Sequence, residues 1–373
     1  MTPLHAELAR LIAVEGPITV ARYMALCLGD PRFGYYMTRD PFGADGDFTT
    51  APEISQMFGE LVGLWCADAW QRMGRPGRVL LVELGPGRGT LMADALRAAR
   101  IVPGFRDALE VHLVETSPVL RERQRATLAE AGVAVSWHAG IEDLPDGPLL
   151  VVANEFFDAL PVRQIVARGG RWHERLVGLD DAGGLIFGLA PEAFPASAPA
   201  GPDGGVLELH ELGTRIAATL AGRIAATGGA MLAIDYGYEG PALGDTLQAL
   251  KRHAFVDVLA DPGEADLTVH VDFHALGVAA RGAGAAVHGP VGQGAFLREL
   301  GIAARAAALS RRAADGGEAQ RRALARLTDE GPAGMGSLFK VLAVTQAGLG
   351  TPAGFDSVPQ AGELSRSPGG ESS

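Results

Sequence analysis

The sequence predicts an α/β fold built on a doubly wound, mostly parallel sheet. From Val79 onward, short apolar runs alternate with helical stretches, which is typical of strands buried between two layers of helices. The first run ends in a cluster of glycines, and acidic or amide residues follow several others. Seven runs qualify as strands, at residues 79–84, 109–114, 133–137, 149–153, 230–234, 285–288 and 337–344.

A glycine-rich turn follows the first predicted strand. Gly85, Gly87 and Gly89 let the backbone bend sharply and approach a ligand closely, because glycine has no Cβ atom. The dinucleotide fingerprint G-x-G-x-x-G needs Gly or Ala where this chain has Thr90. The observed G-x-G-x-G pattern, with Glu83 two residues before it, resembles motif I of class I S-adenosyl-L-methionine (SAM) methyltransferases. A carboxylate there would also repel a pyrophosphate, so SAM is favoured over NAD, and both hypotheses stay open at this stretch.

Composition and charge restrict the partners and the compartment. The 373 residues are 47% hydrophobic, enough for a substantial core, and carry a net charge of −12. A nucleic-acid partner is not expected, since binding phosphates needs clustered Lys and Arg, whereas a cationic substrate would suit this charge. No membrane span and no signal peptide are predicted. Cys27 and Cys66 form no C-x-x-C pair and are expected to be buried thiols in a reducing compartment, so the cytoplasm is predicted.

The N-terminal part is expected to be a helical segment followed by a loop. Apolar periodicity predicts helices over residues 4–15 and 20–28, and another helix starts near Pro52. The loop before this helix contains Gly46 and Thr50. Two interpretations are open. Thr50 and Pro52 are ordinary helix-capping residues, or the loop closes over a cofactor site.

The ends of the second and third predicted strands carry polar residues that suit a nucleoside. Glu115 follows residues 109–114 and is placed to accept hydrogen bonds from both hydroxyls of a ribose. NAD and SAM enzymes share this device, so Glu115 does not choose between them. Ile141 and Glu142 follow residues 133–137, where methyltransferases contact adenine, although an ordinary polar turn explains them equally well.

The ends of the fourth and fifth predicted strands carry a denser polar cluster. Asn154, Glu155 and Asp158 follow the fourth strand, and Asp235 follows the fifth. The carboxyl ends of central strands form the crevice where open α/β sheets bind ligands. Because carboxylates beside two phenylalanines make a poor core, this cluster predicts a substrate site.

The remaining segments add an insertion and a tail. Residues 167–205 are rich in Gly, Pro and Asp, which predicts a β-hairpin insertion followed by a loose loop. His270 and His274 are four residues apart but lack the H-E-x-x-H pattern, so no metal site is predicted. Residues 348–373 show no apolar period and are expected to be disordered.

Taken together, several stretches resemble one family, the MidA-like class I SAM-dependent methyltransferases, whose mitochondrial members assist assembly of respiratory complex I. The similarity runs from about Leu4 to Ala347. The glycine motif is shared by a whole superfamily, whereas the first and fourth of the matching stretches are far more specific. The stretches are 46–60 (GDFTTAPEISQMFGE), 83–92 (ELGPGRGTLM), 115–118 (ETSP), 154–161 (NEFFDALP), 234–237 (IDYG), 245–249 (DTLQA) and 262–268 (PGEADLT).

The resemblance implies a class I methyltransferase fold, which is Rossmann-like with a seven-stranded sheet, and SAM as the cofactor. It also implies a protein substrate, an arginine of a complex I core subunit. A guanidinium stays charged and forms planar two-point bonds with carboxylates, so Glu155, Asp158 and Asp235 are the expected catalytic residues. The expected cofactor-binding residues are Gly46, Thr50, Glu83, Gly85, Gly87, Gly89, Glu115, Ile141, Glu142 and Asn154.

Other hypotheses remain beside this one. The chain could methylate a small molecule, with the Gly/Pro-rich insertion shaping the pocket, or be an assembly factor that binds SAM without catalysis, or be an NAD enzyme. The expected organisation is an N-terminal helical segment and covering loop over residues 1–75, a methyltransferase domain over 76–347, and the tail over 348–373. The oligomeric state is left open.

Overall fold

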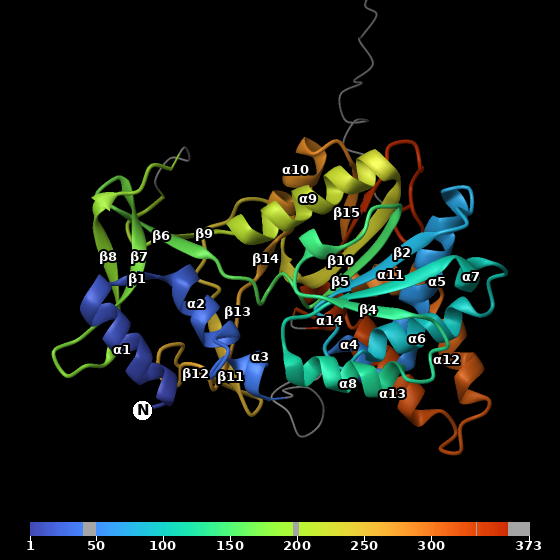
Figure 1. The fold of residues 1–373 in the computed structure, drawn as a ribbon, viewed down its shortest axis with the longest axis horizontal. Helices are drawn as coiled ribbons and strands as arrows, with labels where there is room; N and C mark the ends of the chain where they lie inside the picture. Colours follow the sequence, from blue (N-terminus) through green and yellow to red (C-terminus); the bar gives the residue numbers. More distant parts are fainter. Residues whose placement is uncertain (40–49, 197–200, 333, 357–373) are drawn as a thin grey trace, which may run out of the picture.

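The chain folds into two bodies that lie side by side (Figure 1). The computed structural model describes residues 1–39, 50–196, 201–332 and 334–356. The larger body is a mixed sheet covered by helices. The smaller body combines short helices with two antiparallel sheets.

The central sheet of the larger body has eight strands, in the order β15-β16-β10-β5-β2-β3-β4, with β14 beside β10. Neighbouring strands from β10 to β4 run parallel, and β16 and β15 are antiparallel. The predicted α/β class and mostly parallel sheet are therefore confirmed. The predicted count of seven misses β14, because a strand of two residues leaves no sequence pattern. The strands are β2 (Val79–Leu84), β3 (Leu109–Val114), β4 (Val135–His138), β5 (Leu149–Asn154), β10 (Gly229–Tyr238), β14 (Val271–Asp272), β15 (Ala286–Gly292) and β16 (Phe339–Thr345).

Helices cover both faces of this sheet. Alternate residues of β2 point to opposite faces, so Val79 and Leu81 join one core while Leu80 and Val82 join the other. Burial on both faces explains why these strands are continuous apolar runs in the sequence. The first core includes α5 (Gln56–Arg72), α6 (Thr90–Ala99), α11 (Gln293–Glu299), α12 (Ile302–Ser310) and α13 (Glu318–Thr328), and the second includes α9 (Glu211–Thr227) and α10 (Phe273–Gly282). The shorter pieces of this body are α4 (Ala51–Ile54), α7 (Phe105–Ala108), α8 (Pro118–Leu128), the 3₁₀ helix η1 (Ile141–Asp143) and α14 (Met335–Leu338).

The smaller body is assembled from chain segments that are far apart in the sequence. Leu8, Tyr23, Val177 and Leu267 come from different segments and are buried in one shared core. The predicted domain boundaries at residues 75 and 347 follow chain order rather than this packing, and they stay a prediction. The elements are α1 (Pro3–Glu15), β1 (Ile18–Thr19), α2 (Val20–Gly29), α3 (Tyr35–Thr38), β6 (Arg163–Arg168), β7 (Arg171–Leu179), β8 (Leu185–Ala193), β9 (Val206–Leu209), β11 (Gln248–Lys251), β12 (Ala254–Val256) and β13 (Asp266–Thr268).

The first residues of the predicted disordered tail are packed against the larger body. Leu349 and Phe355 are buried, and Trp65 Nε1 donates a hydrogen bond to the carbonyl oxygen of Ala353 at 3.1 Å. The prediction of disorder is therefore wrong for residues 348–356. Two apolar residues without a helical or strand period can still anchor a chain on a core. The rest of the predicted tail lies outside the described residues.

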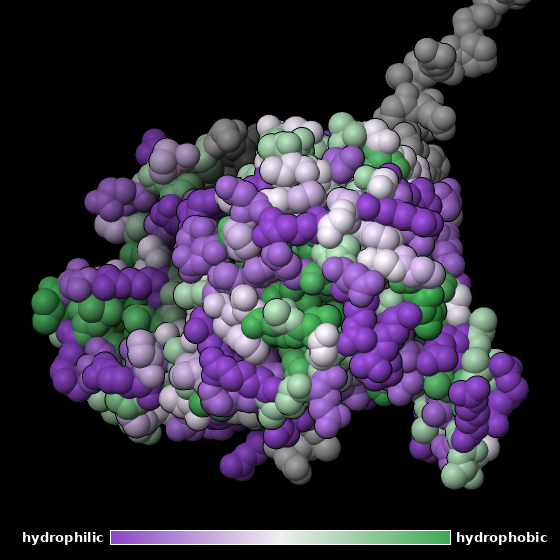
Figure 2. All heavy atoms as spheres, turned by 45° about the vertical axis from the view of Figure 1, so that its right-hand side comes forward, coloured by the Kyte–Doolittle hydropathy of each residue, from purple (hydrophilic) through white to green (hydrophobic). Residues whose placement is uncertain are grey.

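Hydrophilic residues cover most of the face drawn in Figure 2, and hydrophobic residues gather there in separate patches. Within the described residues, no helix is both long enough and apolar enough to cross a membrane.

Replacing Phe355 by Ala should lower the free energy of unfolding by about 3 kcal/mol, because a fully buried aromatic side chain leaves a cavity when it is truncated. Phe355 is 1% exposed and lies 5.6 Å from Phe296, ring centre to ring centre. Phe255→Ala is the matched control, because that ring is 75% exposed. Urea unfolding at 25 °C measures both variants, and equal stability of the two would contradict the described packing.

Candidate active site

The glycine turn after β2 forms one wall of a cavity in the larger body. Gly85 and Gly87 have left-handed backbone angles, with φ of +58° and +53°. A Cβ atom on Gly85 would lie 3.0 Å from the ring of Phe156, so a larger residue would crowd this ring. Gly89 ends the turn as the N-cap of α6. The cavity is lined by Thr50, Pro52, Glu53, Glu83, Gly85, Pro86, Gly87, Arg88, Thr90, Leu91, Asn154 and Glu155.

Two buried oxygen atoms of residues that line this cavity have no hydrogen-bond partner among the described residues. They are Glu83 Oε2 and Asn154 Oδ1. Burial, together with the charge of Glu115, raises the pKa of Glu83 well above its ordinary value. An unsatisfied buried acceptor costs about 1–3 kcal/mol, so both atoms suit a ligand that brings charged N–H donors. The α-ammonium group at the amino-acid end of SAM has this chemistry, and the residues therefore fit the cofactor.

Glu115 lies close to the glycine turn, but its carboxylate does not line the cavity. Its Oε1 accepts the N–H of Ser117 at 2.8 Å, and its Oε2 accepts from Gln124 Nε2 at 3.1 Å. Gln124 Nε2 also donates to the carbonyl oxygen of Gly87 at 2.8 Å, which ties Glu115 to the turn. Burial raises the pKa of Glu115, while these hydrogen bonds lower it. The predicted contact with a ribose stays a prediction.

The other predicted cofactor residues occupy different places. Ile141 and Glu142 form η1 after β4 and do not line the cavity, and Glu142 is exposed. Gly46 lies outside the described residues. Thr50 is buried, lines the cavity and makes no side-chain capping hydrogen bond to α4. Its hydroxyl therefore does not act as the helix cap that local sequence rules suggested.

The N-terminal segment reaches the cavity through α4. The N–H of Ala51 donates to Glu155 Oε1 at 3.0 Å. Glu53 Oε1 accepts from the Thr90 hydroxyl at 2.5 Å, and Glu53 Oε2 lies 3.8 Å from Arg88 Nη1. Sequence reasoning did not single out Glu53 as a site residue. Its position in the most specific N-terminal stretch was the available signal.

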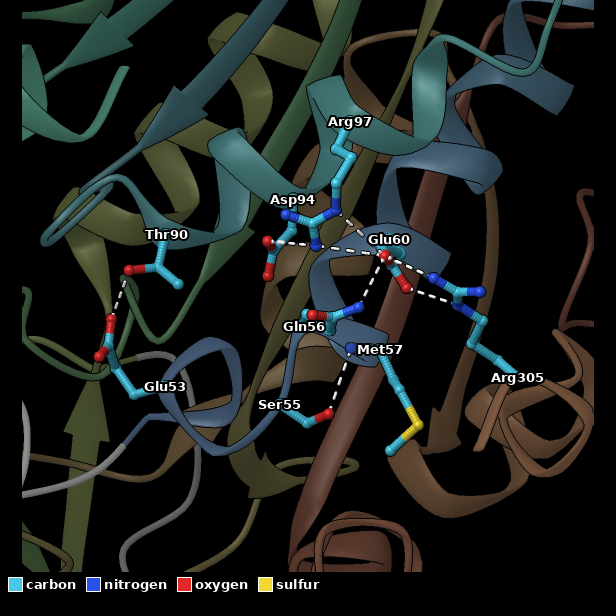
Figure 3. A network of polar contacts seen from close by, with 9 residues as sticks. All are labelled: Glu53, Ser55, Gln56, Met57, Glu60, Thr90, Asp94, Arg97 and Arg305. Atoms are coloured by element: carbon cyan, nitrogen blue, oxygen red, sulfur yellow. Dashed lines mark hydrogen bonds and ion pairs between the residues drawn. The ribbon is translucent and has the colours of Figure 1, made fainter. Parts of the chain in front are cut away.

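A partly buried ionic network holds α5 against α6, which begins at the glycine turn (Figure 3). Glu60 on α5 is 5% exposed and accepts from Gln56, from Arg97 on α6 and from Arg305 on α12. Arg97 also pairs with Asp94 at 2.6 Å. Figure 3 shows Glu53 and Thr90 beside this network. Thr90 is the first residue of α6, and both residues line the cavity. The network therefore links the position of the N-terminal segment to that of the glycine turn.

Glu155 and Asp158 lie just after β5, and neither forms an ion pair with a cation among the described residues. Glu155 has a left-handed backbone angle, φ +50°, which is uncommon for a residue other than glycine. Burial raises the pKa of Glu155 to about 7 and that of Asp158 to about 6. Asp158 Oδ1 is buried and has no hydrogen-bond partner in the described structure. The two carboxylates are available to a cationic ligand.

The Asp235 carboxylate, predicted to bind the substrate, accepts hydrogen bonds from the backbone. It is fully buried, and its Oδ2 accepts the backbone N–H groups of Phe156, Phe157 and Asp158 at 3.0–3.2 Å. Its Oδ1 accepts the N–H of Tyr236 at 3.0 Å. Burial and the nearby carboxylates raise the pKa of Asp235 well above its ordinary value. Both oxygens thus accept backbone N–H groups, and Asp235 shapes the turn that carries Glu155 and Asp158, while its predicted catalytic role stays a prediction.

Comparisons with known proteins agree on one kind of enzyme. Residues 61–291 match a family model described as an S-adenosyl-L-methionine-dependent methyltransferase. A Drosophila melanogaster protein named protein arginine methyltransferase NDUFAF7 homolog, mitochondrial, is 41% identical, over 91% of this chain and 85% of its own length. The Homo sapiens protein arginine methyltransferase NDUFAF7, mitochondrial, is 39% identical, over 82% of this chain and 75% of its own length.

A solved structure resembles the whole fold. It is a Burkholderia thailandensis protein in complex with S-adenosyl-homocysteine. The TM-score is 0.84 at 32% sequence identity, and the match covers 97% of this chain and 96% of that chain.

The predicted cytoplasmic location is wrong on this comparison, because the curated relatives are named as mitochondrial proteins. The prediction rested on the lack of a predicted membrane span and signal peptide and on two buried thiols, Cys27 and Cys66, which are indeed free and buried. Buried thiols are compatible with any reducing compartment, so they could not distinguish one from another.

Replacing Glu83 by Gln should weaken SAM binding at least about tenfold, because a hydrogen bond to a charged group contributes about 1.5–3 kcal/mol. The folded-state pKa of Glu83 is raised, so its favourable contribution to stability is present at low pH and lost as pH rises through that pKa. At pH 8 the ligand-free variant should therefore melt above the wild type. Calorimetry with SAM and thermal unfolding measure both effects.

Glu110→Gln is the control for this substitution, because Glu110 lies on the neighbouring strand in an exposed ion pair with Arg78. It should leave SAM affinity unchanged. Equal SAM affinities for Glu83→Gln and wild type would remove Glu83 from the cofactor site.

Proposed function

The chain belongs to the family of S-adenosyl-L-methionine-dependent methyltransferases, and from that premise we propose that it is a protein arginine N-methyltransferase. The family and the cofactor predicted from the sequence are confirmed. The acceptor is proposed from the names of the relatives and from the chemistry of the cavity. Its substrate is a protein, and the family resemblance favours an arginine of a complex I core subunit.

Glu155 and Asp158 support arginine as the acceptor. Glu155 lines the cofactor cavity, and Asp158 follows it by three residues with one buried oxygen unpaired. No Arg or Lys in the described part of the chain forms an ion pair with either carboxylate. A guanidinium is the protein cation best matched to this arrangement, because it is planar, always charged and rich in N–H donors.

When bound, SAM supplies an electrophilic methyl group on its sulfonium. The residues of this chain then act mainly by position. Glu155, at the cavity wall, holds one guanidinium nitrogen toward the cavity and accepts its N–H. The N–H of Ala51 donates a hydrogen bond that fixes the Glu155 carboxylate, and Asp235 fixes the turn after β5 by accepting its backbone N–H groups. A carboxylate on one side of the guanidinium also disfavours delocalisation over the reacting nitrogen, which makes this nitrogen a better nucleophile.

The proposal is tested by transfer of a labelled methyl group from SAM to an extract of cells that lack this protein. Mass spectrometry should find methylated arginine on a discrete acceptor protein, with dimethylarginine on a complex I core subunit as the expected product. Label confined to small molecules would indicate a small-molecule methyltransferase. Binding of SAM without conversion to S-adenosyl-L-homocysteine would indicate a non-catalytic assembly factor.

Glu155→Gln should keep SAM binding and lose methyl transfer by about 100-fold or more, since it keeps the shape of the side chain but removes the charge that orients the acceptor. SAM affinity by calorimetry and initial rates with labelled SAM separate the two effects. Glu211→Gln, an exposed position outside the cavity, serves as the control and should be unaffected. Unchanged turnover in Glu155→Gln would exclude Glu155 from the mechanism.

The rate should depend on pH through these carboxylates, because only their ionised forms bind a guanidinium. With pKa values of about 7 for Glu155 and about 6 for Asp158, kcat/KM should rise between pH 5 and pH 8 by at least about tenfold. Their contribution to stability has the opposite sign. This contribution is present below the ordinary carboxyl pKa and is lost as pH rises through 6 and 7. Protonation of these carboxylates at low pH therefore does not unfold the protein, and unfolding cannot explain the lower activity at pH 5. A flat profile at constant circular dichroism would contradict the assignment.

A further inference from the structure

A second polar cluster, here called the bridging cluster, lies where the smaller body meets the turn after β5. It consists of Tyr36 on α3, Asp158, Tyr236 on β10 and Asp266 on β13. The Tyr36 hydroxyl donates to Asp266 Oδ1 at 2.8 Å. Asp158 and Tyr236 interact through their side chains. Neither Tyr36 nor Asp266 was singled out from the sequence, and neither has a part in the function proposed above.

Backbone contacts fix both sides of this cluster. The Ser117 hydroxyl, two residues after Glu115, donates to the carbonyl oxygen of Tyr36 at 2.6 Å. The N–H of Val269, directly after β13, donates to the carbonyl oxygen of Asp158 at 3.0 Å. The smaller body is thus tied to the larger one beside Glu115 and at the Glu155–Asp158 turn, and Tyr36 carries the link on to Asp266.

An unsatisfied atom within the cluster points to a ligand. Asp158 is 6% exposed, and its Oδ1 has no hydrogen-bond partner in the part of the chain that the structure describes. Burial raises the pKa of Tyr36 well above its ordinary value, and the charges of Asp266, which accepts the Tyr36 hydroxyl, and of Asp158 nearby raise it further. Two buried carboxylates around one hydroxyl therefore create a strongly negative site with an unfilled acceptor position.

We propose that Asp266 is a specificity residue of the acceptor site, where it and Asp158 bind the guanidinium from the side of the smaller body. This inference rests on the proposed function. Tyr36 is the positioning residue, because its hydroxyl holds the Asp266 carboxylate in place. A planar guanidinium can donate to two carboxylates at once through its fork of N–H groups, whereas the ammonium of lysine is a compact point charge. The bridging cluster therefore selects arginine over lysine.

Ethylguanidinium, a mimic of the arginine side chain, is the probe for this site, and propylammonium is its point-charge control. The assay is methyl transfer from labelled SAM to cell extract at limiting acceptor concentration. Ethylguanidinium should inhibit the wild type at concentrations where propylammonium does not. In Asp266→Asn the concentration for half inhibition by ethylguanidinium should rise at least about tenfold, with SAM affinity unchanged. Tyr36→Phe should show a smaller rise in the same direction.

Asp261→Asn is the matched control, because it removes the same charge from a partly exposed pair with Lys251 in the smaller body. Methyl transfer by this variant should be inhibited by ethylguanidinium at the same concentrations as in the wild type. Unchanged inhibition in Asp266→Asn would overturn the proposal. If Asp266→Asn does not fold, Tyr36→Phe provides the test. Loss of the stronger inhibition by ethylguanidinium than by propylammonium supports the proposal, and the same difference between the two probes as in the wild type overturns it. A wild type that transfers no methyl to protein would instead refute the proposed function itself.

Discussion

Carboxyl groups with unfilled hydrogen-bond positions, buried at one edge of the sheet, are the constraint on which the site depends. Parallel pairing of β10, β5, β2 and β3 brings their carboxyl ends to the same edge. Within the described part of the chain, Glu83 and Asp158 each leave a buried oxygen there without a hydrogen-bond partner. Such groups cost free energy in the absence of a ligand, and the apolar cores on both faces of the sheet offset this cost. A ligand that carries positive charge and N–H donors relieves it, so the same atoms that destabilise the empty fold create affinity.

The smaller body gives this edge a second wall. Its N-terminal helices share a core with strands that come from two later segments of the chain. This packing brings Tyr36 and Asp266 together, whereas Thr50 and Glu53 line the cavity of the larger body. The Glu60 network joins α5 to α6 and α12. It thereby holds the segment that carries Thr50 and Glu53 against the helix that follows the glycine turn. In the proposed function, the cofactor lies in the cavity of the larger body and the acceptor approaches from the side of the smaller body.

Much of the larger body could be predicted because its signals are local. Apolar runs buried on both faces identify the strands. Gly85 and Gly87 predict a turn that needs left-handed backbone angles, which both residues adopt. The order of polar residues along the chain also located Glu83, Asn154 and Glu155 at the cavity. Strand-end position alone could not reveal that Asp235 uses both oxygens on backbone N–H groups.

Long-range contacts were beyond sequence reasoning. Tyr36 and Asp266 are separated by 230 positions and meet only through the packing of the smaller body. Phe355 is buried. Sequence reasoning assigned it to a disordered tail because a single apolar residue shows no helical or strand periodicity. A crystal structure with S-adenosyl-L-homocysteine tests the central claim most directly. The account predicts the amino group of that ligand within about 3 Å of Glu83 Oε2 and Asn154 Oδ1. An ordered ligand with its amino group away from both atoms would contradict it.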